Sequence, residues 1–540
     1  MNSSDGQQAL WIFGRSSVSY GLPVGGCQLD RDDTYTLPSN DHLRYPEILM
    51  NHQHDQSDPS SQPHRLLAVL GIPFDDVSFE DVLAWISRRV RDRHPAYIAT
   101  VNLDFIMQAW RDPEQQRILL EADLVVADGF PIIMLSKLMG MKLKERVTGS
   151  DLTPMLAGLS AREGCSLYLL GGAKGVPEAA AAKLAELSPG VRIAGCYSPP
   201  KADLLDMDHA EILNRLEAAK PDILLVAFGA PKQEKWVHMH KHAWTVPVSI
   251  GVGGTLDFLA GTQKRAPKIF QRLYLEWLWR MFSDPRRLFK RYAGNLWFLV
   301  TATLRMLYVR YGRMSAVHKD RDRLDELALA DVQARRVVLP PLSTVEECEA
   351  FLAAALNDSN GWAVVVDLQD REWLNPMEIG ACIQLVRRSR FVKSAVHVLA
   401  AHPRTYRQLQ WMHLDTYLQA ESSAPAMIAS LRQRLEQVRQ GRVTVDDANR
   451  LHILLPAELT AATLPQFREQ VQAVWDEAEI SGVRVDASVL SFLDSTALGY
   501  LMTVKRAAAN LTGGYSGTGF HGNALQTLKI ARLDGELLAP

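Results

Sequence analysis

Short apolar runs alternate with amphipathic stretches between residues 65 and 262, and this alternation indicates the fold class. The runs are AYIATVN, DLVVADG, SLYLLGG, VRIAGCY, DILLVAFG and VPVSIGVGG. Apolar strands without polar alternation are typical of burial on both faces. The intervening stretches, such as SFEDVLAWISRRV and PEAAAAKLAEL, have a helical pattern, and Ser78 with Asp81 predicts a capping box. We therefore predict an α/β fold, with a doubly wound, Rossmann-like parallel sheet over residues 65–262.

The regions flanking this sheet differ from it in composition. Residues 1–64 are rich in Ser, Asp, Asn, Gln, His and Pro, which predicts a flexible extension. Residues 263–315 are basic and aromatic, and a charged linker follows over residues 316–334.

The last two hundred residues contain an internal repeat. Residues 366–388 align without a gap on residues 485–507, and the same offset carries HPRTYRQLQWMHLD onto HGNALQTLKIARLD. The coinciding pairs are Asp367 and Asp486, Gly380 and Gly499, His402 and His521, and Asp415 and Asp534. Each copy has the pattern strand, helix, strand, loop, helix. The repeat predicts two small α/β domains, a first repeat over residues 335–425 and a second repeat over residues 440–540.

Bulk composition narrows the class of protein. The chain has 540 residues, a formal net charge of −2 and five scattered cysteines without a Cys-x-x-Cys pair. That cysteine usage is typical of a reducing cytosol rather than of a disulfide framework or a zinc site. The N-terminus lacks a signal-peptide pattern, and no run of about eighteen uncharged apolar residues predicts a membrane span. The near-neutral charge disfavours nucleic acid as a partner.

Polar and glycine residues gather where the predicted strands end. Candidate substrate-binding positions are Thr100, Asn102, Arg146, Asp151, Gln233, Gly171, Gly172, Gly253 and Gly254, and Asp128 follows the strand DLVVA. Ligands of open α/β sheets bind at the carboxyl ends of the strands, and glycine-rich junctions before helices suit a diphosphate. Taken singly, Asp128-Gly129 could be only a turn, LLGG and GVGG only tight turns, and Asp151 only an N-cap. Together they predict a site for a phosphate-bearing ligand.

A metal site is not expected. The acidic pairs Asp30-Arg-Asp32 and Asp206-Met-Asp208 do not follow a strand. Of the three histidines at 238, 240 and 242, only His238 and His242 would share a helical face, so we expect a solvated helix face there.

The basic segment QKRAPKIFQRLYLEWLWRMFSDPRRLFKRYAGNLWFLVTATLRMLYVRYGRM has three interpretations. It could be a helical hairpin packed on the sheet, or a surface that stacks single-stranded nucleic acid. Interleaved Trp, Tyr and Arg are also typical of helices at a membrane surface, which we favour. Its arginines could bind an anionic lipid diphosphate.

These residues together resemble the WecG/TagA/CpsF glycosyltransferases, glycosyltransferase family 26. The resemblance spans about residues 66–300 and depends on TVNLDF, ADLVVADGFP, ERVTGSD, LYLLGG, AFGAPKQEKW and GVGGTLDFLAGTQKRAP. It implies an inverting, metal-independent transfer of a sugar from a UDP-sugar to a polyprenyl-diphosphate-linked saccharide. This reaction serves cell-wall or exopolysaccharide biosynthesis at the cytoplasmic face of a bacterial membrane, to which the enzyme is peripheral. No cofactor is implied beyond the UDP-sugar substrate.

The resemblance also implies roles for individual residues. Asp128 matches the proposed general base, and Thr100 with Asn102 matches the pocket lining. Arg146 and Asp151 would hold the sugar and its phosphates, and Gln233 would contact substrate. Arg280, Arg287 and Arg291 would face the lipid diphosphate.

The repeats resemble STAS domains, the fold of anti-sigma-factor antagonists. In SFLDSTALGYL, Ser495 and Thr496 occupy positions that can be phosphorylated in that family, although Ala497 replaces the usual glycine. The first repeat has Pro376 and Met377 there and therefore reads as a binding or packing module. A helix N-cap is the alternative reading of Ser495 and Thr496. The leading hypothesis is a transferase with a STAS-like regulatory tail that binds a protein partner. The alternative is a non-catalytic scaffold that recruits partners to a polysaccharide assembly complex.

Overall fold

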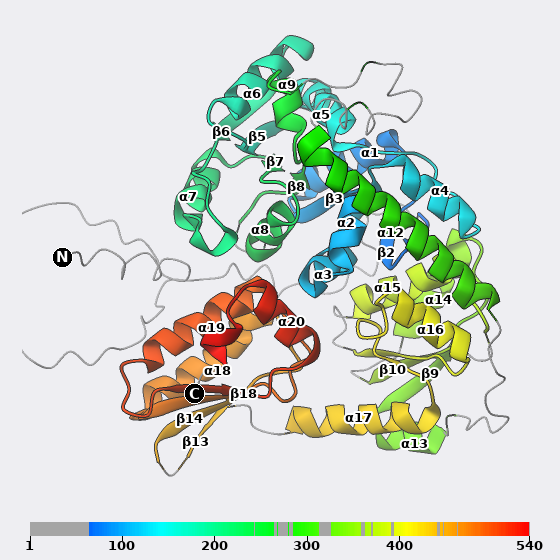
Figure 1. Cartoon of the computed structure of the whole chain (residues 1–540), viewed down its shortest axis with the longest axis vertical. Coiled ribbons are helices and arrows are strands. Elements are labelled where there is room, and N and C mark those ends of the chain that lie inside the picture. The colour runs from blue at the N-terminus through cyan, green and yellow to red at the C-terminus, as the bar shows by residue number, and fades with distance from the viewer. Residues whose placement is uncertain are drawn as a thin grey trace, which may run out of the picture. The chain divides into compact units, whose positions relative to one another are not determined.

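The computed structural model of the chain describes residues 64–241, 244–263, 267, 279, 285–312, 324, 326–357, 362–368, 371–389, 394–439, 443–446, 448–461 and 463–538. They divide into two compact units: residues 60–200 with 219–440, and residues 201–218 with 441–540. Figure 1 labels the elements of both. The expected extension over residues 1–64 lies almost entirely outside the described residues, as do residues 316–323 and 325 of the linker and residues 268–278 of the basic segment.

The first unit contains the predicted parallel sheet. Its six strands are ordered β4-β3-β8-β7-β5-β6, and every neighbouring pair is parallel. The strands are β3 (Ala96–Val101), β4 (Leu124–Ala127), β5 (Ser166–Gly171), β6 (Arg192–Tyr197), β7 (Ile223–Ala227) and β8 (Val248–Gly251). All except β6 are almost entirely buried, as expected for apolar runs covered on both faces. The predicted fold class is confirmed.

Helices cover both faces of this sheet. One face carries α1 (Phe79–Asp92), α5 (Gly149–Glu163), α6 (Val176–Leu187) and α9 (Thr255–Leu259), and the other carries α2 (Leu103–Ala109), α3 (Pro113–Glu121) and α8 (Lys232–His240). The first unit also contains α4 (Phe130–Leu138) and the long helix α12 (Pro285–Tyr311). The elements η3 (Leu204–Asp206) and α7 (His209–Ala219) fall almost entirely in the other unit. The predicted capping box between Ser78 and Asp81 is present at the start of α1.

A hairpin precedes the sheet, formed by β1 (Leu66–Val69) and β2 (Ile72–Asp75). Every one of its residues is buried. The hairpin packs against β4, α3 and α4 of the region with the six-stranded sheet and against α15 of the first repeat. It therefore lies between residues 113–138 and residues 376–389, two parts of the sequence about 250 residues apart.

The first repeat is a parallel four-stranded sheet ordered β12-β11-β10-β9. Its elements are α13 (Glu326–Asp331), β9 (Ala334–Val338), α14 (Val345–Leu356), β10 (Ala363–Asp367), α15 (Pro376–Ser389), β11 (Val396–Leu399), α16 (Pro403–Trp411), β12 (Ala420–Glu421) and α17 (Ala424–Arg439). Its contacts with the hairpin are close. A Cβ on Gly380 would overlap the backbone oxygen of Leu66, and one on Gly71 would overlap that of Met412.

Polar contacts reinforce this interface. Gln116 Nε2 donates to the carbonyl oxygens of Met412 and His413 at 3.2 and 3.0 Å, and Arg387 Nε donates to that of Leu120 at 2.5 Å. The first repeat is thus packed as part of the first unit.

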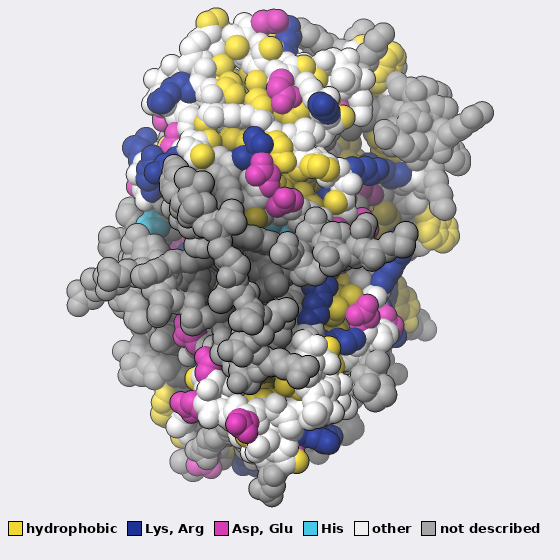
Figure 2. Space-filling view, turned by 90° about the vertical axis from the view of Figure 1, so that its left-hand side faces the viewer, with side chains coloured by type: hydrophobic (Ala, Val, Ile, Leu, Met, Phe, Trp, Pro, Cys, Tyr) yellow, Lys and Arg dark blue, Asp and Glu magenta, His cyan; other side chains and the backbone are white. Residues whose placement is uncertain are grey.

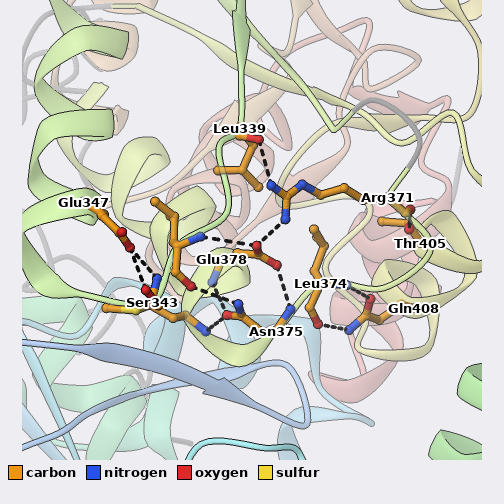
Figure 3. A network of polar contacts seen from close by, with 11 residues as sticks. Leu339, Ser343, Glu347, Arg371, Leu374, Asn375, Glu378, Thr405 and Gln408 are labelled. Atoms are coloured by element: carbon orange, nitrogen blue, oxygen red, sulfur yellow. Dashed lines mark hydrogen bonds and ion pairs between the residues drawn. The ribbon is translucent and has the colours of Figure 1, made fainter.

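A polar network fixes the loop of the first repeat that aligns with SFLDSTALGYL of the second repeat (Figure 3). Asn375 Oδ1 accepts hydrogen bonds from Met377 N and Glu378 N, both at 2.9 Å, and the buried Glu378 pairs with Arg371. Gln408 bridges to both backbone groups of Leu374. These bonds hold the loop within the first repeat. The loop has Pro376 and Met377, and therefore no hydroxyl, at these two positions.

The second repeat has a four-stranded sheet ordered β13-β14-β16-β18, in which only β13 is antiparallel to its neighbour. Its elements are β13 (Val443–Val445), β14 (Arg450–Leu454), β15 (Glu458–Leu459), α18 (Leu464–Glu477), β16 (Gly482–Asp486), β17 (Phe492–Leu493), α19 (Ser495–Ala508), β18 (Tyr515–Thr518), α20 (Gly522–Ile530) and α21 (Asp534–Leu537). The strand–helix–strand–helix order β16, α19, β18, α20 repeats β10, α15, β11, α16, as the internal repeat predicts.

Two further features concern the length and apolarity of the helices and the distribution of surface charge. No helix among the described residues is long and apolar enough to cross a membrane. On the face shown in Figure 2, the visible Lys and Arg side chains are interspersed with Asp and Glu.

Candidate active site

The carboxyl ends of β3, β4 and β8 define a topological switch point. The chain runs from β3 outward to β4, then crosses to β5 on the other side of β3 and returns to β8. In open α/β sheets, ligands bind in the crevice at such a point. The residues that follow these three strands are therefore the first candidates for chemistry.

Asp128 lies at this edge, directly after β4. Its backbone N–H donates to Val101 O at 2.8 Å, which fixes the residue beside the end of β3. The four strand residues before it are buried, whereas Asp128 is partly exposed. Gly129 caps α4, and a Cβ there would lie 3.9 Å from Asn102 Cβ. Asp128 is thus a partly exposed acid at the end of β4, next to the end of β3.

Thr100 and Asn102 shape the edge through the backbone. The buried Thr100 hydroxyl donates to Gly251 O at 2.9 Å and joins β3 to the end of β8. Asn102 Oδ1 accepts from Asp104 N at 3.0 Å and Phe105 N at 3.3 Å and so caps α2. Both residues lie at the edge of the predicted site. Their side chains form hydrogen bonds to the backbone that fix the positions of β8 and α2.

The loop containing Arg146 and Asp151 brings the start of α5 to the same edge. Thr148 is the N-cap of α5, and Asp151 stands at the third helical position, where it accepts a 2.7 Å bond from the Thr148 hydroxyl. The reading of Asp151 as an N-cap is therefore wrong. Arg146 Nη2 lies 3.8 Å from Asp151 Oδ2. A Cβ on Gly149 would lie 3.6 Å from Thr100 Oγ1, which places this helix terminus beside β3.

Gln233 is 2% exposed and ties two glycine loops together. Its Oε1 accepts from Gly229 N at 3.1 Å and from Gly253 N at 3.2 Å. Gly253 has a φ of +50°, a left-handed conformation that favours glycine, and Gly254 caps α9. In this arrangement Gln233 shapes the substrate edge by positioning those loops.

Gly171 and Gly172 end β5, farther along the edge. Both have positive φ, and a Cβ on Gly171 would lie 2.7 Å from Ala227 O. Gly172 N donates to the same oxygen at 3.1 Å. The backbone geometry of a tight turn is sufficient to require these two glycines.

Only one of the three predicted lipid-diphosphate arginines has a described side chain. Arg280 lies outside the described residues, and Arg287 lies in α12 with its side chain outside them. Arg291 Nη2 forms an ion pair with Asp104 Oδ2 at 2.8 Å. Because α2 begins at the end of β3, this pair ties α12 to the candidate site.

The histidine prediction is wrong in one respect. His238 and His240 are buried rather than on a solvated face, and His240 packs against Trp236 at 5.1 Å between ring centroids. His242 lies outside the described residues.

Glu234 is a feature that the sequence reasoning did not single out as a site residue. Its side chain is fully buried beside Tyr97, whose hydroxyl lies 3.3 Å from Oε1, and Oε2 has no hydrogen-bond partner among the described residues. Burial raises the pKa of Glu234 to about 7. The sequence does not predict this raised pKa. An acid at the start of a helix is ordinarily exposed, and Glu234 is buried only because its face of α8 packs against the sheet.

Replacing Glu234 by Gln is expected to flatten the pH dependence of stability. In the folded protein the carboxyl stays protonated up to about pH 7, whereas its ordinary pKa is 4.5, so wild-type stability falls as pH rises between these values. At pH 8 the variant should be more stable by on the order of 2–3 kcal/mol. Denaturant unfolding at pH 4.5 and pH 8 measures the difference, and an equal loss in both proteins would contradict this assignment.

Comparisons with known proteins cover two regions of the chain. Residues 67–311 match the model of the Glycosyl transferase WecG/TagA/CpsF family, and residues 444–539 match that of the Mlab, STAS domain. An N-acetylglucosaminyldiphosphoundecaprenol N-acetyl-beta-D-mannosaminyltransferase of Bacillus spizizenii is 34% identical over 192 residues, or 36% of this chain and 73% of that protein. Proteins of the same name from Bacillus subtilis and Staphylococcus aureus strain MRSA252 are 31% and 28% identical, over 83% and 85% of their own lengths and 40% and 41% of this chain.

Proposed function

Because this chain belongs to the WecG/TagA/CpsF family of glycosyl transferases, we propose that it transfers a sugar from a UDP-sugar to a polyprenyl-diphosphate-linked saccharide. The names of its relatives make N-acetylglucosaminyldiphosphoundecaprenol the first acceptor to test and N-acetylmannosamine the first donor sugar. The observation that carries the proposal is the partly exposed Asp128 at the switch point, next to Ala127, whose carbonyl oxygen accepts a hydrogen bond from Val147 N in the loop before α5.

In the proposed mechanism, Asp128 acts as the general base. Its carboxylate takes the proton of an acceptor hydroxyl while that oxygen forms a bond to the anomeric carbon of the donor. The bond from that carbon to the UDP oxygen breaks on the opposite face, which inverts the configuration. The backbone amides at the start of α5 and at Gly254 are suited to the donor diphosphate, with Arg146 nearby. Holding both substrates in line supplies much of the acceleration.

A peripheral contact with the cytoplasmic membrane face suits this substrate. Helix α12 carries a continuous stripe of exposed apolar side chains with helical spacing. They are Leu296, Trp297, Val300, Leu304, Leu307, Tyr308 and Tyr311. Aromatic residues on such a stripe, with Arg291 and Arg310 on the same helix, are typical of an interfacial helix. The Arg291–Asp104 pair would place this contact next to the acceptor site.

The second repeat is proposed to bind a protein partner and to regulate the enzyme. At the position where the first repeat buries Trp411 against Trp110, with ring centroids 6.0 Å apart, the second repeat has Ile530, which is 45% exposed. Asp494, not Ser495 or Thr496, is the N-cap of α19, so the simple capping alternative does not hold for the two hydroxyls. Thr496 is the more exposed of the two, and its phosphorylation would place a dianion beside Asp494.

Acceptor-dependent UDP release tests the proposal. The full chain is incubated with a panel of UDP-sugars and a polyprenyl-diphosphate N-acetylglucosamine acceptor, and both UDP and the lipid product are followed. We expect UDP release only when the acceptor is present. Silence across the panel from a folded protein would favour the scaffold, with the second repeat as its functional part.

A further inference from the structure

Helix α4 has an apolar face where a surface helix ordinarily has a polar one. Ile132 and Leu135 are buried toward the protein. On the other side Phe130, Met134 and Leu138 are 37%, 57% and 49% exposed, at positions i, i+4 and i+8 of one face. An exposed apolar stripe of this regularity marks a surface that another apolar phase covers.

The charged residues near this stripe indicate that a lipid bilayer covers it. Residues 130–144 contain three lysines and no acid. Lys137 and Lys142 are exposed, and Lys144 is paired with Asp81 at 3.5 Å. Exposed lysines beside an apolar stripe are complementary to anionic lipid headgroups over acyl chains.

The position of α4 adds a second argument. The helix begins at Phe130, and its N-cap Gly129 directly follows Asp128 and lies beside Asn102. Asn102 in turn caps α2, whose Asp104 holds Arg291 of α12 at 2.8 Å. The apolar stripes of α4 and α12 therefore belong to helices that are both anchored at the candidate active site.

We infer that α4 is a second membrane-contacting helix, whose stripe of Phe130, Met134 and Leu138 enters the surface of an anionic bilayer. This inference deepens the proposed function and rests on it, because an acceptor with a polyprenyl chain is presented by such a surface. Contact through α4 and α12 brings the Asp128 edge to the membrane, so that the acceptor can be reached without leaving the bilayer.

The test measures vesicle binding by the full chain in the absence of substrates. The vesicles contain phosphatidylglycerol and phosphatidylethanolamine, and the proteins are wild type, the double variant M134Q/L138Q and the control L187Q. Leu187 ends α6 and is 53% exposed, so it matches Met134 in exposure. We expect the double variant to bind about tenfold more weakly than wild type and the control to bind as wild type does.

Three results would overturn the inference: absence of wild-type binding, equal binding by the double variant, or an equal loss in L187Q. A change in oligomeric state with unchanged vesicle binding would assign the stripe to a second copy of the chain instead. Because binding is measured without donor or acceptor, a silent transfer assay does not affect this result. Conversely, equal turnover of wild type and the double variant on a short-chain, water-soluble acceptor would show that catalysis itself is intact.

Discussion

Replacing Asp128 by Asn is expected to lower the turnover number by about 10²–10⁴-fold, the usual contribution of a general base. Asn keeps the size of the side chain but cannot take the acceptor proton. The fold should persist, because the residue is held by its backbone bond to Val101 O and because Gly129, not Asp128, caps α4. Turnover is measured as acceptor-dependent UDP release, and thermal unfolding checks the fold.

A matched control for this variant lies at the other end of the same strand. Asp123 precedes β4, and its Oδ2 accepts a hydrogen bond from Tyr97 N at 2.9 Å. Asp123→Asn retains an acceptor oxygen and lies at the amino edge of the sheet, so it should transfer sugar at a near-normal rate. Near-normal turnover by Asp128→Asn would remove Asp128 from the mechanism.

The paired variants Gly380→Ala and Gly499→Ala are expected to change stability in opposite directions. The two glycines occupy the same position of the repeat, in α15 and α19. A methyl group on Gly380 overlaps the backbone oxygen of Leu66, which cannot move without displacing the hairpin, so the free energy of unfolding should fall by about 1–3 kcal/mol or more. Around Gly499 the described structure has no atom within 4 Å of the added methyl group. There Ala should stabilise the helix by about 0.5–1 kcal/mol.

Calorimetric unfolding of both variants measures these changes. The Gly380 variant should also lose transferase activity in proportion to its lost fold, whereas the Gly499 variant should keep full activity. A neutral effect of Gly380→Ala would mean that α15 and β1 do not approach as closely as described.

The sequence was sufficient for the parallel sheet and for the placement of Asp128, because both depend on local pattern. Short apolar runs without alternation, separated by helical stretches, are typical of strands in a parallel sheet, and a polar residue at the end of such a run is expected at the edge of the sheet. The family membership follows from the same motifs and is confirmed by the relatives. The roles of the individual site residues remain proposals that the variants above test.

Other features depend on tertiary contacts that no local pattern contains. Gln233 is shown to brace two loops only once Gly229 and Gly253 are brought together around it. His240 is buried because Trp236 and Trp244 enclose it, although its helix has a polar composition. Gly380 and Gly499 are indistinguishable as repeat positions, and only the neighbouring hairpin separates their roles.

The buried hairpin sets a limit on where this gene can be shortened. The family match ends at residue 311, but β1 is covered by α15, which begins at Pro376. A stop codon placed between these points would keep the motifs shared with the family but would expose to water the side of β1 that α15 covers. A fragment that ends at the family boundary, residue 311, should therefore aggregate. A truncated protein should instead continue through α17 to Arg439. The segment that this chain shares with its relatives is therefore shorter than the segment that we expect to be needed for folding.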